Sequence, residues 1–386
     1  MKILLKKGKE KLVRMGHPWV FSGAVDSIQG KADEKRLCAV HAFDGSLIGT
    51  GYYNEKSAIC VRMLSKSAQF TDGDLRERLS AAIERREALL TGGDTDSCRL
   101  VNSEGDFLPG LTVERYGEGL CLQITTAGME AWRGSIINIL KELLSPAFIY
   151  ERSDTEARKR EGLNDSEGLI SGSLSEPLII KEKGLNFGVN LASGQKTGFF
   201  FDQRENRRLV RSYSEGRAVC DCFSYSGGFA ISAALGGAKS VLAVDTSAKA
   251  GKWLAQNAGL NGVNVEFKED DVFSYLRQPD SKFDLIVLDP PKFARHAGET
   301  DRAARGYKDI NLAALKRLSA GGLLFTFSCS NAVDPYLFRQ IVFSAAADSG
   351  RDIQLLHALT AGVDHPVNVA HKEGEYLKGL VLRVVS

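Results

Sequence analysis

Short apolar runs alternate with amphipathic stretches of helical length from about residue 217 onward. Two of the amphipathic stretches cover residues 248–257 and 303–318, where apolar side chains recur at the spacing of one helix face. Strands that alternate with helices in this way pair in parallel, with the helices as crossover connections. The pattern predicts an α/β domain whose strands lie at residues 218–222, 240–245, 264–268, 283–289 and 323–328.

The last two apolar runs, at residues 353–357 and 377–385, have no helical pattern between them. Strands joined without a crossover helix pair in the antiparallel sense. We therefore expect these two runs to form a hairpin at one edge of the sheet.

The first 70 residues have a different pattern, in which the apolar runs are short and glycines separate them. Runs at residues 20–21, 37–40, 47–49 and 59–62, bounded by such turns, predict a small β-barrel. A helix is expected over residues 72–90, with Asp72 or Asp74 as its cap.

A mixed region follows, with strands predicted at residues 108–113, 120–124 and 147–150 and a helix near 130–143. Residues 162–176 are rich in Gly and Ser and predict an exposed loop. The chain is thus divided into a barrel (1–70), a small central α/β domain (71–185) and a larger α/β domain (186–386).

Composition limits the class of protein. Of the 386 residues, 43% are hydrophobic and 25% charged, which is typical of a soluble globular protein. No apolar run reaches the roughly 18 residues of a membrane span, and the first residues are too polar for a signal peptide, so we expect a cytoplasmic protein. The seven cysteines are dispersed and form no CxxC pair, which argues against a disulfide framework or a structural zinc site, and no metal is expected.

A Gly/Ser turn follows the strand at 218–222 and leads into a helix. Such a turn lets a ligand approach the backbone and directs N–H groups toward it. Asp245 ends the next strand, where an acidic residue reaches ribose hydroxyls, and Asp271 follows the third, where it could reach an adenine amino group. The alternative is that strands often end in Asp because Asp favours turns and caps. The predicted cofactor-binding residues of this region are Asp221, Phe223, Ser224, Tyr225, Ser226, Gly227, Asp245, Asp271 and Asp289.

The turn lacks GxGxxG spacing, and no phosphate-binding lysine follows it. A dinucleotide is therefore disfavoured relative to S-adenosylmethionine (SAM), which carries no bridging phosphate. A hydride-transfer acid is not evident either, which argues against a dehydrogenase.

Asp289 opens the motif Asp-Pro-Pro-Lys-Phe at the next strand end. Two prolines make the turn stiff and extended, so that it can present the Asp289 carboxylate to the flat edge of a base. The alternative is a rigid loop with no substrate contact.

Cys329 ends the following strand and would face the same cleft. A thiolate that adds to carbon 6 of cytosine makes carbon 5 nucleophilic enough to accept a methyl group, and cysteine is suited to this addition. Asp289 could share a proton with ring N3 if its pKa were raised in a dry pocket. The alternative for Cys329 is a small buried apolar residue, and Cys222, the competing cysteine, is interpreted as packing.

Basic residues gather in three places and could hold phosphates without reading sequence. Trp19 and its aromatic neighbours lie beside the first cluster and could stack on unpaired bases. The alternative for each cluster is a solvated surface. The predicted RNA-binding residues are Lys6, Lys7, Trp19, Arg204, Lys292, Arg305 and Lys308.

Long motifs resemble those of the bacterial 23S ribosomal RNA methyltransferases of the large-subunit methyltransferase I type, which form 5-methylcytosine. The resemblance runs nearly end to end. It includes residues 16–25 (GHPWVFSGAV), 108–116 (LPGLTVERY), 151–154 (ERSD), 194–204 (GQKTGFFFDQR), 222–229 (CFSYSGGF), 289–293 (DPPKF), 305–311 (RGYKDIN) and 327–330 (FSCS).

The resemblance implies an N-terminal PUA domain, a central α/β domain and a Rossmann-like class I methyltransferase domain that uses SAM. It implies that Cys329 is the nucleophile, and that Lys196, Thr197, Phe199 and Gln203 lie beside the cofactor or the base. The implied partner is ribosomal RNA, naked or in an assembling large subunit, with no membrane. A homodimer is one candidate assembly.

Two other functions stay open at this point. Methylation of a purine nitrogen often uses an Asp/Asn-Pro-Pro turn followed directly by an aromatic, whereas Lys292 intervenes here, and that chemistry has no need of Cys329. A non-catalytic RNA-binding assembly factor is the other, against which the acids at the strand ends argue.

Overall fold

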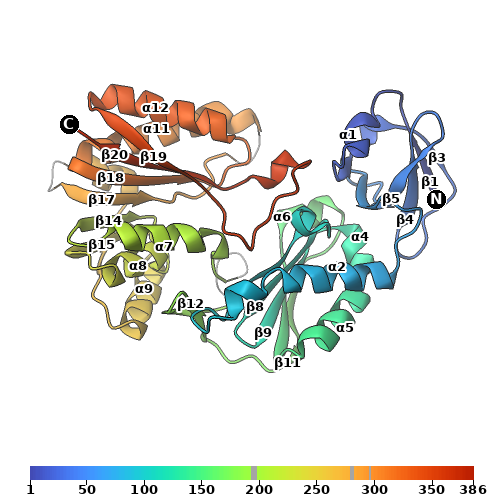
Figure 1. Cartoon of the computed structure of the whole chain (residues 1–386), viewed down its shortest axis with the longest axis horizontal. Coiled ribbons are helices and arrows are strands. Elements are labelled where there is room, and N and C mark those ends of the chain that lie inside the picture. Colours follow the sequence, from blue (N-terminus) through green and yellow to red (C-terminus); the bar gives the residue numbers. More distant parts are fainter. Residues whose placement is uncertain (193–197, 279–281, 295–296) are drawn as a thin grey trace. The chain divides into compact units, whose positions relative to one another are not determined.

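The computed structural model describes residues 1–192, 198–278, 282–294 and 297–386, apart from the side chain at 297. Two compact units divide the chain. Unit 1 contains Met1–Lys181, Val189–Phe201 and Val363–Gly374, and unit 2 contains Glu182–Gly188, Asp202–Gly362 and Glu375–Ser386 (Figure 1). Neither unit is one continuous stretch of sequence.

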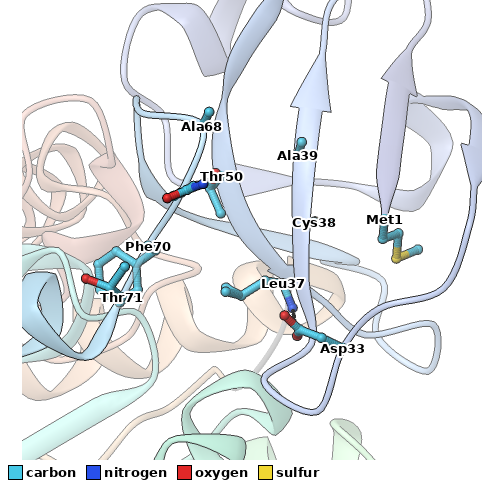
Figure 2. Close-up of a pocket in the computed structure, with 10 residues that line it drawn as sticks. Met1, Asp33, Leu37, Cys38, Ala39, Thr50, Ala68, Phe70 and Thr71 are labelled. Atoms are coloured by element: carbon cyan, nitrogen blue, oxygen red, sulfur yellow. Dashed lines mark hydrogen bonds between the residues drawn. The ribbon is translucent and has the colours of Figure 1, made fainter.

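A six-stranded sheet in the order β2-β6-β5-β4-β1-β3 forms the first part of unit 1. Its apolar side chains, such as Ile3, Val40 and Val61, alternate toward one enclosed core. A pocket of about 350 Å³ is lined by Met1, by Leu37 and Ala39, and by residues 68–71 (Figure 2). The elements are β1 (Lys2–Leu5), α1 (Lys11–Arg14), β2 (Trp19–Val20), η1 (Ser22–Ala24), β3 (Val25–Gln29), β4 (Leu37–His41), β5 (Leu47–Tyr53) and β6 (Val61–Ser65).

A five-stranded sheet in the order β11-β10-β9-β8-β7 forms the second part of unit 1, with helices packed on its apolar side. Its elements are α2 (Asp72–Glu84), α3 (Glu87–Leu90), β7 (Cys98–Asn102), η2 (Ser103–Asp106), β8 (Leu111–Tyr116), β9 (Gly119–Ile124), α4 (Ala127–Ala131), α5 (Arg133–Leu144), β10 (Phe148–Ser153), α6 (Glu156–Arg160) and β11 (Ser166–Gly172). A hairpin of β12 (Leu178–Glu182) and β13 (Leu185–Val189) follows.

Three local predictions in this part were wrong. The loop expected over 162–176 contains β11, which pairs antiparallel with β10. The helix expected over 72–90 is split into α2 and α3, and the buried Arg86 between them binds Asp106 at 2.6 Å and 2.8 Å. The cap of α2 is Thr71, while Asp74 completes its capping box.

Unit 2 is built on a seven-stranded sheet in the order β16-β15-β14-β17-β18-β20-β19. The predicted strands are confirmed, and β20 pairs antiparallel with both β18 and β19, as expected of the edge hairpin. The strands are β14 (Ala218–Cys222), β15 (Ser240–Asp245), β16 (Glu266–Glu269), β17 (Phe283–Leu288), β18 (Leu318–Ser328), β19 (Ile353–Thr360) and β20 (Lys378–Val384).

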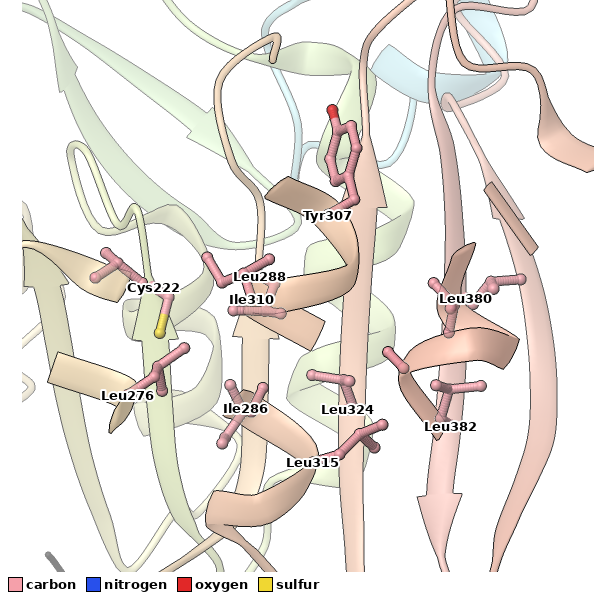
Figure 3. Packing of buried hydrophobic residues seen from close by; sticks show 14 of the residues in the cluster. Cys222, Leu276, Ile286, Leu288, Tyr307, Ile310, Leu315, Leu324, Leu380 and Leu382 are labelled. Carbon is pink, nitrogen blue, oxygen red and sulfur yellow. The ribbon is translucent and has the colours of Figure 1, made fainter. Parts of the chain in front are cut away.

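Helices cover both faces of this sheet because side chains of each strand alternate between two cores. Ile286, Leu324 and Leu382 point to one face, where Ile310 and Leu315 of α11 pack on them (Figure 3). The helices of that face are α10 (Val272–Arg277), α11 (Thr300–Arg317) and α12 (Pro335–Ser349). Those of the other face are α7 (Arg204–Tyr213), α8 (Gly228–Leu235) and α9 (Ala248–Leu260), and the short turns are η3 (Phe201–Gln203), η4 (Ala297–Glu299) and η5 (Lys372–Gly374).

Candidate active site

The carboxyl ends of the parallel strands meet at one edge of the unit 2 sheet. In register, Cys222 of β14 lies opposite Val244 of β15 and Leu288 of β17, and Leu288 lies opposite Thr326 of β18. The residues that follow these positions therefore gather at the same edge, where ligands bind in open α/β sheets. They include Asp245, Asp289 and Cys329.

The turn after β14 has an unusual backbone. Phe223 and Tyr225 adopt left-handed φ angles of 62° and 46°, and Gly227 follows at 84°. The N–H groups of Phe223 and Ser224 donate to the carbonyl of Val244 (2.9 and 3.2 Å), which holds the turn against the end of β15. Left-handed conformations at non-glycine residues cost about 1–3 kcal/mol each and cluster at functional sites. The turn thus has the character of a ligand-binding loop.

Asp221 points from β14 into the interior, where it is 1% exposed. Its Oδ2 accepts the N–H of Ala230 in α8 at 2.9 Å, whereas its Oδ1 is buried and has no hydrogen-bond partner among the residues that the structure describes. Burial raises the pKa of Asp221 well above its usual range, the Ala230 N–H opposes this, and the charges of Asp289 and Asp245 add to it. The Oγ of Ser224 is likewise buried and unpartnered. Two such oxygens fit a ligand that donates hydrogen bonds, such as the amino group of SAM.

Asp245 and Asp271 both accept hydrogen bonds from backbone N–H groups at the ends of β15 and β16. Asp245 accepts the N–H of Tyr225 through Oδ2 and that of Ser247 through Oδ1, each at 3.0 Å. Asp271 is exposed and caps α10, accepting the N–H of Ser274 at 2.9 Å. Their predicted roles on ribose and adenine remain predictions.

The residues before α7 lie beside the β19–β20 hairpin. Gln203 is buried and accepts a hydrogen bond from Asn206 (2.6 Å), which also donates to the carbonyl of Thr360 (3.1 Å). Asp202, which sequence reasoning did not select, accepts the hydroxyl of Tyr376 at 2.7 Å. Phe199 is buried in unit 1, and Lys196 and Thr197 lie outside the described residues.

Cys329 is half-buried, whereas the other six cysteines, all within the described ranges, are buried. Its Sγ lies 4.0 Å from the carbonyl oxygen of Pro290, so the cysteine and the Asp-Pro-Pro turn are adjacent. Cys222 is buried among apolar side chains, in agreement with its interpretation as packing.

Two buried serines flank Cys329 and fix its backbone. Ser328 donates to the hydroxyl of Tyr307 in α11 at 3.0 Å, and burial raises the pKa of Tyr307 to about 12. Ser330 bonds both backbone groups of Ala294, accepting its N–H at 3.2 Å and donating to its carbonyl at 2.6 Å. The loop after β18 is therefore tied to the Asp-Pro-Pro segment and to α11.

Lys378, at the start of β20, is a third anchor that sequence reasoning missed. It lies opposite Ser328 in register, and its Nζ donates to the carbonyls of Ser330 (2.7 Å) and Val333 (2.5 Å). Its one sequence signal is a charge within the apolar run of the last strand.

The predicted RNA-binding residues fall into two groups. Arg204 is only 1% exposed and pairs with the buried Glu182 at 3.5 Å, so it belongs to the interior of unit 2. In unit 1, Trp19 donates to Glu104 at 2.8 Å and packs against His371. The side chains of Lys6, Lys7, Lys292 and Arg305 are exposed, and Lys308 is partly exposed and pairs with Asp348 at 2.7 Å.

Family models match two parts of the chain. A model described as a PUA-like domain matches residues 3–66, and one described as an S-adenosylmethionine-dependent methyltransferase matches residues 153–369. The predicted PUA-like and methyltransferase domains and the SAM cofactor are thereby confirmed. In the described part of the chain, no helix is long and apolar enough to cross a membrane.

Solved structures share this fold at low sequence identity. A methyltransferase-like protein solved in complex with SAH has a TM-score of 0.87 at 21% identity, and one from Streptococcus mutans has 0.85 at 21%; both comparisons cover 100% of each chain. At this identity the likeness supports the fold alone.

Curated relatives are similar along their whole length. Proteins named ribosomal RNA large subunit methyltransferase I are 43% identical in Shewanella amazonensis, over 100% of this chain and 99% of theirs, and 41% identical in Escherichia coli O157:H7, over 100% of both. The Aeromonas salmonicida protein of that name is 43% identical over 99% of this chain and 98% of its own. The chain therefore belongs to the ribosomal RNA large subunit methyltransferase I family.

Proposed function

We propose that this SAM-dependent methyltransferase forms 5-methylcytosine in 23S ribosomal RNA, with Cys329 as the nucleophile. The observation that carries the proposal is the placement of Cys329, the one cysteine of the seven that is not buried, with its Sγ 4.0 Å from the Asp-Pro-Pro turn. We retain residues 1–70, 71–185 and 186–386 as the proposed domains.

The cofactor would be held by the turn after β14. Asp221 Oδ1 and Ser224 Oγ are available acceptors there, and the left-handed backbone at Phe223 and Tyr225 brings main-chain atoms to the edge of the sheet. Asp245 and Asp271 would line the ribose and adenine positions, and Lys196, Thr197 and Gln203 would complete the site. Bound SAM supplies an electrophilic methyl group on a sulfonium sulfur, which is the group that carbon 5 of the base takes up.

Cys329 makes carbon 5 reactive. Its thiolate adds to carbon 6 of the cytosine, a bond forms between Sγ and carbon 6, and the ring electron pair moves toward carbon 5. After methylation, loss of the carbon 5 proton to a base re-forms the double bond and breaks the bond to Sγ. The base has to be extruded from any helix to reach the cysteine.

Asp289 would hold the edge of the base. It is half-buried, directly follows the buried strand β17, and is adjacent in sequence to Pro290, whose carbonyl oxygen lies 4.0 Å from the Sγ of Cys329. A carboxyl group there can share a proton with ring N3 and stabilise the charge that the ring gains during addition. Lys292, exposed two residues after Pro290, and Arg305 are proposed phosphate contacts.

Purine nitrogen methylation is less compatible with this geometry. That chemistry often uses an aromatic ring that directly follows the Pro-Pro turn and stacks on the base, but Phe293 packs against Tyr307 (ring centroids 4.6 Å apart) and Phe273 (5.9 Å). Its ring is engaged within the protein, while Lys292 faces solvent.

The RNA would be held by exposed cations of both units. Lys6 and Lys7 lie at the end of the first strand, and the aromatic Phe21 is 49% exposed, whereas Trp19 is engaged with Glu104 and His371. We propose that Lys6, Lys7, Lys292, Arg305 and Lys308 contact phosphates and that Trp19 supports the neighbouring surface.

The test is methylation of unmodified 23S RNA with labelled SAM, followed by mass spectrometry of nucleosides. We expect label in 5-methylcytosine, and at least a thousandfold slower incorporation by Cys329→Ala, because the addition step is lost. Cys60→Ala, a buried cysteine of unit 1, is the matched control and should retain activity. RNA containing 5-fluorocytosine should trap a covalent adduct, since fluorine cannot leave as a proton does. Label in a methylated purine, or full activity of Cys329→Ala, would refute the proposal.

A further inference from the structure

Lys378 carries a buried ammonium group in the last strand of the sheet. The side chain is 4% exposed, and its Nζ donates to two backbone carbonyls, those of Ser330 and Val333. Burial of an unpaired ammonium is costly, and here it lowers the pKa of Lys378 to about 8. The other buried side chains of β20 are apolar, so the buried charge of Lys378 requires an explanation.

The two carbonyls belong to the loop that carries Cys329. The carbonyl of Ser330 also accepts the N–H of Val333 at 3.1 Å, which closes a tight turn directly after the cysteine. Lys378 therefore clamps both ends of this turn from the neighbouring strand. Because Ser328 and Ser330 hold the other side of the loop, the ammonium completes the fixation of the Cys329 backbone.

Charges around Lys378 come from several elements. Negative charge at Cys329, Asp334 or Glu375 favours the ammonium form, Lys292 opposes it, and burial has the largest influence. The attraction between the ammonium and a charged Cys329 is reciprocal. Because Nζ bonds to the carbonyl of the residue directly after Cys329, the ammonium charge of Lys378 lies close to the cysteine and favours its thiolate over its thiol.

We propose that Lys378 is a positioning residue for Cys329, whose buried ammonium fixes the cysteine loop and stabilises the thiolate. Lys378 keeps its proton throughout: the thiol proton leaves to solvent, and the sulfur regains its electron pair when its bond to carbon 6 breaks. The inference has a catalytic meaning only if the proposed Cys329 chemistry holds, but the state of the thiol can be measured without it.

The test is the pH dependence of Cys329 alkylation by iodoacetamide in the full-length protein without RNA. Cys329 is half-buried whereas the other six cysteines are buried, so it should react first, and peptide mass spectrometry verifies the site. We expect Lys378→Met to move the midpoint up by about one pH unit and to slow alkylation at pH 7 about tenfold. Lys378→Arg should restore most of the rate, and Arg383→Met, which removes an exposed charge of the same strand, should behave as wild type.

Two results would overturn the inference. One is a pH midpoint of Cys329 alkylation that is the same in Lys378→Met as in wild type. This includes the case in which the alkylation rate changes by the same factor at every pH, because a change in loop geometry alone alters the rate without altering the pKa of the thiol. The other is a midpoint shift of the same size in Lys378→Arg and Lys378→Met. If the midpoint shifts as expected while Cys329→Ala still methylates RNA, the thiolate inference stands and the proposed function fails.

Discussion

Two turns at the same edge of the sheet are built on opposite principles. The turn after β14 has left-handed residues at Phe223 and Tyr225, and among the described residues the buried Asp221 Oδ1 and Ser224 Oγ beside it have no hydrogen-bond partner. In the loop after β18, the side chains of Ser328, Ser330 and Lys378 all form hydrogen bonds around Cys329. The first turn is strained and unsatisfied, and the second is satisfied and rigid.

The difference corresponds to the two proposed roles, which are cofactor binding at the first turn and nucleophilic attack at the second. A turn with unpartnered polar atoms gains hydrogen bonds when a cofactor arrives, so ligand binding can offset its strain. A nucleophile instead needs fixed geometry before the substrate arrives, because misplacement of the attacking atom costs rate. Mutations should therefore affect cofactor affinity at the first turn and stability or thiol reactivity at the second.

The largest effect in this comparison is expected from the pH dependence of stability at Lys378. The folded pKa of about 8 lies below the usual 10.5, so between these values the unfolded chain binds more protons and stability rises with pH. Wild type should gain on the order of 3 kcal/mol relative to Lys378→Met between pH 7 and 11. Urea unfolding of both proteins across that range measures it, and parallel curves would contradict the burial of a charged lysine.

Ser330→Ala should come next, with a loss of about 2 kcal/mol of unfolding free energy. The substitution removes the partner of both backbone groups of Ala294 in a buried site. Ser212→Ala, which breaks an exposed bond in α7, is the control and should cost under about 0.5 kcal/mol. Equal losses in the two variants would show that the loop is not held by Ser330.

Asp221→Asn should weaken SAM binding about tenfold, measured by titration calorimetry, while the free protein should be at least as stable as wild type at pH 7. Because the pKa of Asp221 is raised in the fold, the ionised side chain costs stability as pH rises above the usual carboxyl value, and the amide removes that cost. The exposed Asp352→Asn serves as the matched control. Unchanged affinity would exclude Asp221 from the cofactor site.

The smallest effect is expected at Tyr225, where the left-handed φ of 46° favours glycine. Tyr225→Gly should be about 1 kcal/mol more stable than Tyr225→Ala, since both lose the ring and only alanine keeps the strain. At the exposed helical Lys252 the order of the same pair should be reversed. Thermal unfolding measures the stability of the four variants. If the alanine variant is the more stable one at both positions, the backbone at Tyr225 is not strained.

The sequence predicts the central strands β14, β17, β18 and β20 because most residues of their apolar runs are buried. The sequence does not predict β11, because none of its residues Ser166–Gly172 is buried and only two of them, Leu169 and Ile170, have large apolar side chains. The sequence also does not predict the break between α2 and α3, where the buried Arg86 binds Asp106, twenty residues later in the sequence. Long-range polar pairs leave no periodic signal.

The strand-end acids and Cys329 could be selected from sequence because strand order fixes where strands end. The buried position of Arg204 could not be predicted, because a charged residue is expected at the surface and the sequence does not show that the buried Glu182 lies beside it. Lys378 and the two serines were missed for a related reason: their value lies in partners up to 48 residues away. One sequence signal could have indicated a shared role for these arginines: Arg204, Arg207 and Arg211 are spaced so that they lie on one helix face.

The segment Val363–Gly374, which belongs to unit 1, has a consequence for biosynthesis. Within unit 1 the buried Arg86 donates to the carbonyl of Asp364 at 3.0 Å, across 278 positions of sequence, and the Asp364 carboxylate accepts the N–H of Arg99 at 3.0 Å. A nascent chain that has emerged only through the first 200 residues still lacks this partner. Unit 1 therefore cannot mature in the order in which it is translated, and its final closure has to wait for a segment made after nearly all of unit 2.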